Sequence, residues 1–156
     1  MPNTKALATP VMVLAMMLPL RAAAAQTAPA GPQERVQGIG GFFFRAKAPK
    51  VLAKWYADHL GVTLTPTDYG HESWQQAAGP TVFEPFPAAT KYFGTEGQPF
   101  MLNFRVRSLD AMVAQLRSAG IAVDVDPMKY PNGVFARLSD PEGNPIQLWQ
   151  PQGTSK

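Results

Sequence analysis

Near its C-terminus the chain reads Asp140-Pro141-Glu142-Gly143-Asn144-Pro145-Ile146-Gln147-Leu148-Trp149-Gln150, the pattern of a tight turn that leads directly into a β-strand. Proline presets φ at the first corner of the turn, and glycine and asparagine tolerate the positive φ that such turns use. Ile146 and Leu148 then alternate with Gln147 and Trp149, which is the period of a strand with two different faces. The role of Gln147 on its face is the main functional question that the sequence raises.

The composition is that of an ordinary globular domain. The chain has 156 residues, 46% of them hydrophobic and 16% charged, which is enough for one domain or two fused half-domains. The net charge is only +3 and there is no run of basic residues, so nucleic acid is not an expected partner. The absence of cysteine excludes disulfides, thiol nucleophiles and cysteine metal sites.

The N-terminus has the pattern of an export signal. Lys5 precedes an apolar run at residues 6–20, and Ala23-Ala24-Ala25 fits a cleavage site before Gln26. We therefore expect a signal peptide over residues 1–25, with a short membrane anchor as the alternative. Residues 26–37 are rich in proline, alanine and glutamine and are expected to be a flexible linker. The mature protein is expected to be periplasmic or secreted, with no segment in the membrane.

The rest of the chain is organised as two similar halves. Each half is expected to begin with a strand, continue with a helix that ends at glycine, and finish with three strands. In the first half these elements are expected at 40–47, 49–60, 62–65, 72–77 and 81–84. In the second half they are expected at 100–107, from the N-cap Ser108 to Gly120, and at 121–125, 134–138 and 146–150.

This tandem arrangement resembles the vicinal oxygen chelate superfamily of glyoxalases, bleomycin-resistance proteins and extradiol dioxygenases. The resemblance is carried by the Asp-Pro-x-Gly-Asn turn at Asp140–Asn144 and the Trp-Tyr-x-x-x-Leu-Gly helix end at Trp55–Gly61. It covers residues 38–152, with modules at about 38–87 and 99–151. It implies an α+β fold in which tandem βαβββ modules curl eight strands into an incomplete barrel around a cavity. A homodimer is common in the superfamily and is expected here.

The resemblance also identifies four positions at which metal-dependent members hold a divalent ion. They are occupied here by Gly41, Thr81, Met101 and Gln147. Glycine has no ligating side chain, methionine is a soft ligand, and no carboxylate is present to neutralise the ion. We therefore expect no catalytic metal and no other cofactor. A divalent metal held by atypical ligands belongs to the alternative interpretation.

Strand alternation extends this set of positions to a predicted cavity lining. The side chains expected to contact a ligand are Phe43, Arg45, Phe83, Met101, Asn103, Arg105, Gln147 and Trp149, with Phe135 and Arg137 as further candidates. Apolar walls with a few polar groups are typical of small-molecule sites, and arginines favour an anionic ligand.

Several of these side chains have a purely structural interpretation as well. Gln147 has a potential partner in Asn103 across the cavity, and Arg137 has potential partners in Asp140 or Glu142. Arg45 and Arg105 are equally well explained as strand-end residues in solvent.

The predicted function is therefore an exported protein that binds a small aromatic or anionic organic molecule without a catalytic metal, as sequestering bleomycin-resistance proteins do. The alternative is an enzyme, a glyoxalase-like lyase or isomerase or a dioxygenase with atypical metal ligands. A third hypothesis is a scaffold whose cavity is filled by its own side chains. The serines show no nucleophile motif.

Overall fold

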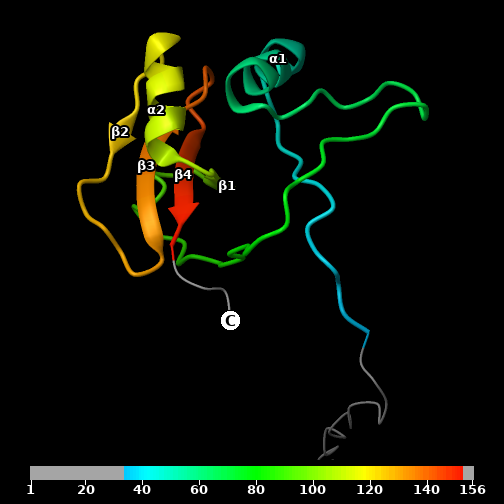
Figure 1. Cartoon of the computed structure of the whole chain (residues 1–156). Helices are drawn as coiled ribbons and strands as arrows, with labels where there is room; N and C mark the ends of the chain where they lie inside the picture. Colours follow the sequence, from blue (N-terminus) through cyan, green and yellow to red (C-terminus); the bar gives the residue numbers. More distant parts are fainter. Residues whose placement is uncertain (1–33, 153–156) are drawn as a thin grey trace, which may run out of the picture. The chain divides into compact units, whose positions relative to one another are not determined.

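The computed structural model describes residues 34–152 (Figure 1), so the predicted signal peptide and most of the predicted linker lie outside the described residues. The chain divides into two units after Gly41. In the N-terminal unit, residues 34–41 form neither helix nor strand. Within the described residues no helix is long and apolar enough to cross a membrane.

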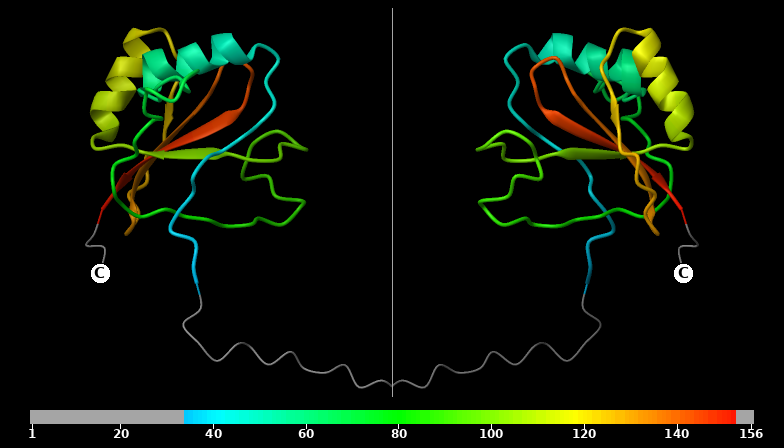
Figure 2. Two further views of the ribbon diagram at one scale, coloured as in Figure 1. Left: turned by 90° about the vertical axis from the view of Figure 1, so that its right-hand side faces the viewer. Right: turned by 90° about the vertical axis from the view of Figure 1, so that its left-hand side faces the viewer.

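The unit that begins at Phe42 is built from two helices and one mixed sheet. Its elements in chain order are α1 (Pro49–Leu60), β1 (Leu102–Arg105), α2 (Leu109–Ser118), β2 (Asp124–Val125), β3 (Gly133–Ser139) and β4 (Pro145–Pro151). The sheet order is β1-β4-β3-β2, with β1 parallel to β4 and the other pairs antiparallel. Figure 2 shows this sheet below the two helices. The α+β class expected from the sequence is confirmed.

Residues at the ends of both helices explain where the helices begin or end. α1 has proline in its first turn, where the missing N–H leaves no hydrogen bond unmade, and Gly61 takes φ 70° at its C-terminal end. The Ser108 side chain accepts a hydrogen bond from the Ala111 N–H and caps α2. The predicted bounds of the first helix and the predicted cap of the second are confirmed.

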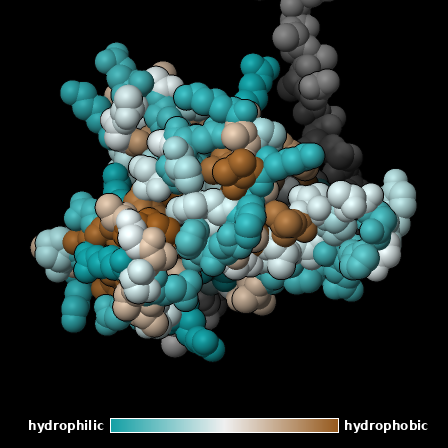
Figure 3. All heavy atoms as spheres, turned by 90° about the horizontal axis from the view of Figure 1, so that it is seen from above, coloured by the Kyte–Doolittle hydropathy of each residue, from teal (hydrophilic) through white to brown (hydrophobic). Residues whose placement is uncertain are grey.

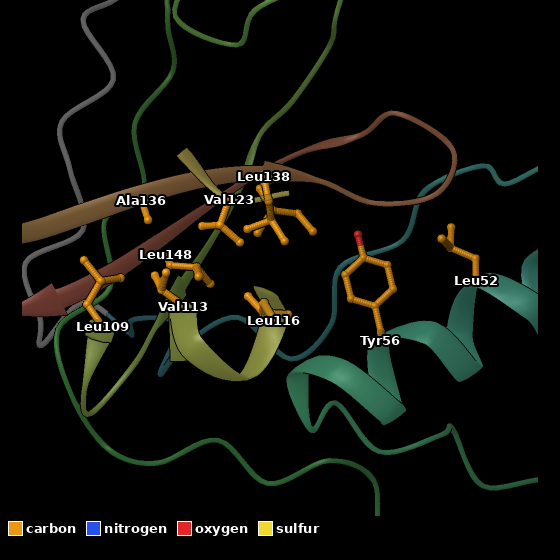
Figure 4. Close-up of a cluster of buried hydrophobic side chains, with 10 residues drawn as sticks. Leu52, Tyr56, Leu109, Val113, Leu116, Val123, Ala136, Leu138 and Leu148 are labelled. Atoms are coloured by element: carbon orange, nitrogen blue, oxygen red, sulfur yellow. The ribbon is translucent and has the colours of Figure 1, made fainter. Parts of the chain in front are cut away.

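The core lies on one face of the sheet. Ala136 and Leu138 of β3 and Ile146 and Leu148 of β4 are buried there, against the apolar faces of both helices. α1 contributes Leu52 and Tyr56, and α2 contributes Leu109, Val113 and Leu116 (Figure 4). The residues between these strand positions therefore point to the opposite face, because strand side chains alternate.

The Asp140–Asn144 turn joins α1 to the sheet through one buried carboxylate. Asp140 is only 5% exposed and accepts hydrogen bonds from the Tyr56 hydroxyl (2.9 Å), the Glu142 N–H (2.9 Å) and both the backbone and side-chain N–H groups of Asn144 (2.9 and 2.7 Å). Burial, helped by the hydrogen bond to Asp140 and its charge, raises the pKa of Tyr56 far above its ordinary value. The tyrosine therefore remains a proton donor to the carboxylate.

The same turn supplies the cap that α1 lacks. No side chain preceding α1 caps its N-terminus. Instead the Glu142 carboxylate accepts hydrogen bonds from the Lys47 and Ala48 N–H groups, at 2.8 Å each. A negative charge at this end also suits the helix dipole. Asp140 and Glu142 thus hold two different parts of the α1 region against one turn.

The first half departs from its predicted strand content. The structure assigns no strand to 42–47, 62–65, 72–77 or 81–84, and Leu64, Val82 and Phe83 are exposed. Extended chain becomes a strand only when its N–H and C=O groups find a neighbouring ladder, and these segments find none within the described chain. The sheet of the described residues therefore has four strands and is open. In the second half, strands at 133–139 and 145–151 confirm the prediction, and the expected strand at 121–125 shortens to Asp124–Val125.

Replacing Asp140 is expected to loosen α1 and the turn together. Asp140→Ala leaves the Tyr56 hydroxyl and the turn N–H groups without their acceptor, which is expected to lower the free energy of unfolding by about 3–5 kcal/mol. Urea denaturation followed by far-UV circular dichroism measures this change.

Asp58→Ala is the matched control, because Asp58 is an exposed partner of Lys54 in a surface ion pair. It is expected to change stability by less than about 0.5 kcal/mol. Equal effects of the two substitutions would contradict the structural role of Asp140.

Candidate functional site

The sheet face opposite the helices carries two rows of polar and aromatic side chains. Strand register places Asn103, Gln147 and Arg137 side by side in one row. Arg105, Trp149 and Phe135 form the next row. The predicted facing of these side chains away from the core is confirmed, since Leu102, Phe104, Ile146 and Leu148 pack on the helix side.

Gln147 is buried and engaged at both ends of its amide. Gln147 is only 6% exposed, and its Oε1 accepts a hydrogen bond from Asn103 Nδ2 at 2.7 Å. Its Nε2 donates to the Tyr92 hydroxyl at 2.9 Å. The bond to Asn103 confirms the structural interpretation of this pair, and the bond to Tyr92 was not anticipated.

Arg137 has a different partner from the one expected. The prediction that it pairs with Asp140 or Glu142 was wrong, because the first carboxylate is used by its own turn and the second by the start of α1. Instead Arg137 donates to the Tyr92 carbonyl at 2.9 Å and places its guanidinium carbon 4.3 Å from the centre of the Tyr92 ring. This cation–π contact joins the connecting segment to the open sheet face.

An aromatic wall stands beside this polar row. Phe135 and Trp149 stack with their ring centres 6.2 Å apart, and Tyr130 meets Phe135 edge-on at 5.7 Å. Trp149 is only 7% exposed and its Nε1 donates to the Asn132 carbonyl at 2.8 Å. The wall is therefore fixed both by stacking and by a hydrogen bond.

A hollow of about 620 Å³ lies between the polar row and this wall. Tyr92, Tyr130, Phe135, Arg137 and Gln147 contribute to its lining, together with Asp124 and Asp126 from the β2 region. A hydrogen bond to the Asp126 carboxylate raises the pKa of Tyr130, so the Tyr130 hydroxyl remains a proton donor to Asp126. The size and mixed lining match those of small-molecule sites.

The structure brings together only part of the predicted lining. Asn103, Arg105, Gln147 and Trp149 are neighbours on the open face, and Met101 lines a second hollow of about 640 Å³. The Arg105 guanidinium donates to the Ala77 carbonyl at 2.7 Å and is not free in solvent.

The other predicted residues lie elsewhere in this chain. Phe43 is 93% exposed, Phe83 is 86% exposed and Arg45 is exposed too, so none of the three joins the hollow. Other large apolar side chains are exposed too, and Figure 3 shows a few hydrophobic groups (brown) on a face that is otherwise mostly polar. Contact of any of these residues with a ligand stays a prediction.

Sequence reasoning missed Tyr92, Tyr130 and Asn132. All three lie outside the predicted helices and strands, so no strand period pointed at them. The only local signal was the aromatic pair Tyr92-Phe93 inside an otherwise polar connection.

The residues at the four superfamily metal positions do not fit a hard divalent ion. Gln147 has both amide atoms engaged, Met101 offers a thioether, and Thr81 is exposed. Gly41 has no side chain to offer. Within residues 34–152 there is also no group of three or more histidine, cysteine, aspartate or glutamate side chains that could hold a metal.

A mixed sheet with helices on one face and a polar, aromatic-walled hollow on the other defines a glyoxalase-like class of protein. The chain belongs to the glyoxalase-like domain family, whose model matches residues 41–149. This places it in the vicinal oxygen chelate superfamily that the two motifs indicated. A comparison with curated proteins returned no match.

Two solved structures show the same fold along most of the chain. One is TnmS3, an antibiotic binding protein from Streptomyces sp. CB03234, with 26% identity and a TM-score of 0.52 over 77% of this chain and 100% of that one. The other is a glyoxalase family protein from Bacillus anthracis, with 19% identity and a TM-score of 0.51 over 77% of this chain and 99% of that one.

A methyl group at Gly133 is expected to displace the aromatic wall. Gly133 has φ 139°, and an added Cβ would overlap the Gln150 carbonyl and lie 2.6 Å from Trp149 Nε1. Gly133→Ala is therefore expected to lower the free energy of unfolding by about 2–4 kcal/mol, as urea denaturation measures, and to shift the tryptophan emission.

Gly143→Ala is the control that separates the cost of a positive φ from the cost of an overlapping Cβ. Gly143 has φ 87° but nothing within 4 Å of an added Cβ. Its expected loss is about 1–2 kcal/mol, with unchanged emission. A Gly133→Ala protein with wild-type stability and emission would show that the wall does not depend on this close approach.

Proposed function

We propose that this protein binds a small aromatic or anionic organic molecule in the hollow beside Gln147, and does so without a catalytic metal. The observation that carries the proposal is the state of Gln147. At a position where metal-dependent superfamily members hold their ion, this residue is instead tied to Asn103 and Tyr92. A side chain engaged in this way is suited to shaping a pocket rather than to ligating an ion.

The chemistry of the lining supports an aromatic or anionic ligand. Phe135 and Tyr130 provide flat apolar surface, and Arg137 provides a partly buried cation with a forked set of donors. The fold neighbour TnmS3 is described as an antibiotic binding protein. Sequestration of a small molecule is therefore the function that we propose, with Gln147 and Arg137 in the lining of the site and Asn103 holding the Gln147 amide in place.

Metal content and ligand binding test this function together. Purified protein is expected to carry less than about 0.1 equivalent of zinc, nickel, manganese or iron by plasma mass spectrometry. Among aromatic acids, 2-naphthoate at 100 times its Kd is expected to raise the melting temperature by about 5 °C or more, with or without EDTA. Arg137→Gln is expected to weaken 2-naphthoate binding about tenfold, because it removes the cation.

The control is Arg107→Gln, at an exposed arginine outside the lining, which is expected to bind as the wild type does. About one equivalent of bound metal, or a ligand response abolished by EDTA, would contradict the proposal. That result would favour the alternative enzyme, a glyoxalase-like lyase or isomerase or a dioxygenase.

We also propose that a second copy of the chain completes an eight-stranded incomplete barrel. The extended segments of the first half expose apolar side chains, with Phe43 93%, Phe83 86% and Val82 66% exposed. β1 lies at an edge of the sheet and pairs only with β4 among the described strands. Unpaired edges and exposed extended segments are complementary, since each supplies the hydrogen-bond partners that the other lacks. The family match spans both halves.

Light scattering after size exclusion tests the assembly. The protein is expected to elute with twice the mass of one mature chain at about 10 μM, and Phe83→Asp is expected to shift it to the monomer by placing a charge in the interface. Val51→Asp, at an exposed apolar residue on α1, is the matched control and is expected to remain a dimer. A monomeric wild-type protein would refute this part of the proposal.

Export is proposed on the residue pattern at 1–25 alone. Lys5, the apolar run and the alanine triplet together are the basis for a periplasmic or secreted mature form. Mass spectrometry of the protein recovered from a periplasmic fraction is expected to show a chain that begins near Gln26. Recovery of the intact chain from the cytosol alone would contradict export.

A further inference from the structure

The Tyr92 side chain lines the hollow beside Gln147 and Arg137. Its hydroxyl accepts the hydrogen bond from Gln147, and its ring lies 4.3 Å from the Arg137 guanidinium carbon. Phe86 stacks on the same ring at 5.2 Å with an interplanar angle of 9°. Tyr92 thus satisfies the groups that would otherwise face a ligand.

The segment that carries Tyr92 is attached to the sheet mainly through these contacts. Residues 87–99 contain turns but no helix or strand. The backbone N–H groups of Thr90 and Gly94 donate locally, to the Pro87 and Lys91 carbonyls, and the Tyr92 carbonyl accepts one long-range hydrogen bond from Arg137. Tyr92 itself is 40% exposed, whereas the wall residue Trp149 is 7% exposed. Moving Tyr92 therefore breaks few long-range interactions, whereas moving Trp149 would disrupt the wall.

We propose that Tyr92 is a displaceable gate that occupies the ligand's place in the free protein. The ligand class that fits is a planar aromatic molecule with an oxygen acceptor at its ring edge, such as a phenol or a ring ketone. Such a molecule replaces each contact of Tyr92: its face meets Arg137 and its oxygen accepts from Gln147. This inference rests on the proposed binding function and adds the chemical class and the competing side chain.

The buried amide of Gln147 gives the site its selectivity. Once Tyr92 moves away, Gln147 Nε2 has lost its acceptor in a residue that is 6% exposed. A ligand that lacks an edge oxygen leaves this donor unpaired, which disfavours plain hydrocarbons. Asn103 continues to hold the other end of the amide, so Nε2 remains aimed at the hollow.

A gate and a wall predict opposite effects of truncating Tyr92. A gate competes with the ligand, so its removal raises the apparent affinity by the reciprocal of the fraction of time for which the site was open. Losing one hydrogen bond and one partly exposed cation–π contact of the gate corresponds to about a tenfold rise in apparent affinity. A wall contributes contacts to the ligand, so its removal lowers affinity.

Equilibrium dialysis against 2-naphthol measures whether truncating Tyr92 raises or lowers the affinity. Tyr92→Ala is expected to bind 2-naphthol about tenfold more tightly than the wild type. Tyr92→Phe keeps the ring but loses the bond to Gln147, and is expected to bind about threefold more tightly. Tyr69→Ala, at a fully exposed tyrosine outside the hollow, is the matched control and is expected to match the wild type. The wild type is expected to bind 2-methylnaphthalene, which lacks the oxygen, about tenfold more weakly than 2-naphthol.

The outcomes separate the gate from the binding function. Equal or weaker 2-naphthol binding by Tyr92→Ala and Tyr92→Phe overturns the gate. Binding of 2-naphthoate without any binding of 2-naphthol to wild type or variants also overturns the gate but leaves the proposed function intact. No binding of either compound to any of these proteins overturns the proposed function and the gate with it.

Discussion

The Asp140 carboxylate is the interaction on which the rest of the described structure depends. It accepts hydrogen bonds from backbone N–H groups of the turn between β3 and β4, and another from the Tyr56 hydroxyl of α1. The reversal of the chain and the docking of the helix therefore share one acceptor. Because the group is buried, it must keep its donors, and those donors hold α1 near one end of the sheet. Glu142, two residues later, accepts hydrogen bonds at the start of α1 and ties that end of the helix to the same turn.

Docking the helices on one face leaves the other face available for chemistry. Alternation along β1, β3 and β4 sends every second residue to that face, and register collects Asn103, Gln147 and Arg137 into one row. Stacked aromatic rings bound the row and Tyr92 covers part of it. The Gln147 amide in its lining is paired with Asn103 and Tyr92, and Arg137 supplies a cation to the same lining.

Local patterns predicted the features that depend on neighbours in sequence. Both helices, the Ser108 cap and the facing of the second-half strands follow from residue periods and turn chemistry. The Asn103–Gln147 bond was also within reach, because both residues were placed on one face. Arg137 was assigned wrong partners because Asp140 and Glu142 are close in sequence, and only the fold shows that both carboxylates are already occupied. Tyr92 lay beyond prediction because an irregular segment has no period from which to infer direction.

The sequence by itself indicated the family and determined the two-faced second half, and it led to the expectation that four positions hold no hard metal ion, since each depends on residue type and spacing. Only the tertiary structure decided which side chains meet. It brought Tyr92 across from a connection to Gln147 and Arg137, and it left the extended segments of the first half without a ladder within the described chain. The physical reason is that contacts between distant residues depend on competition among all available partners, whereas periods and turns depend on neighbours alone.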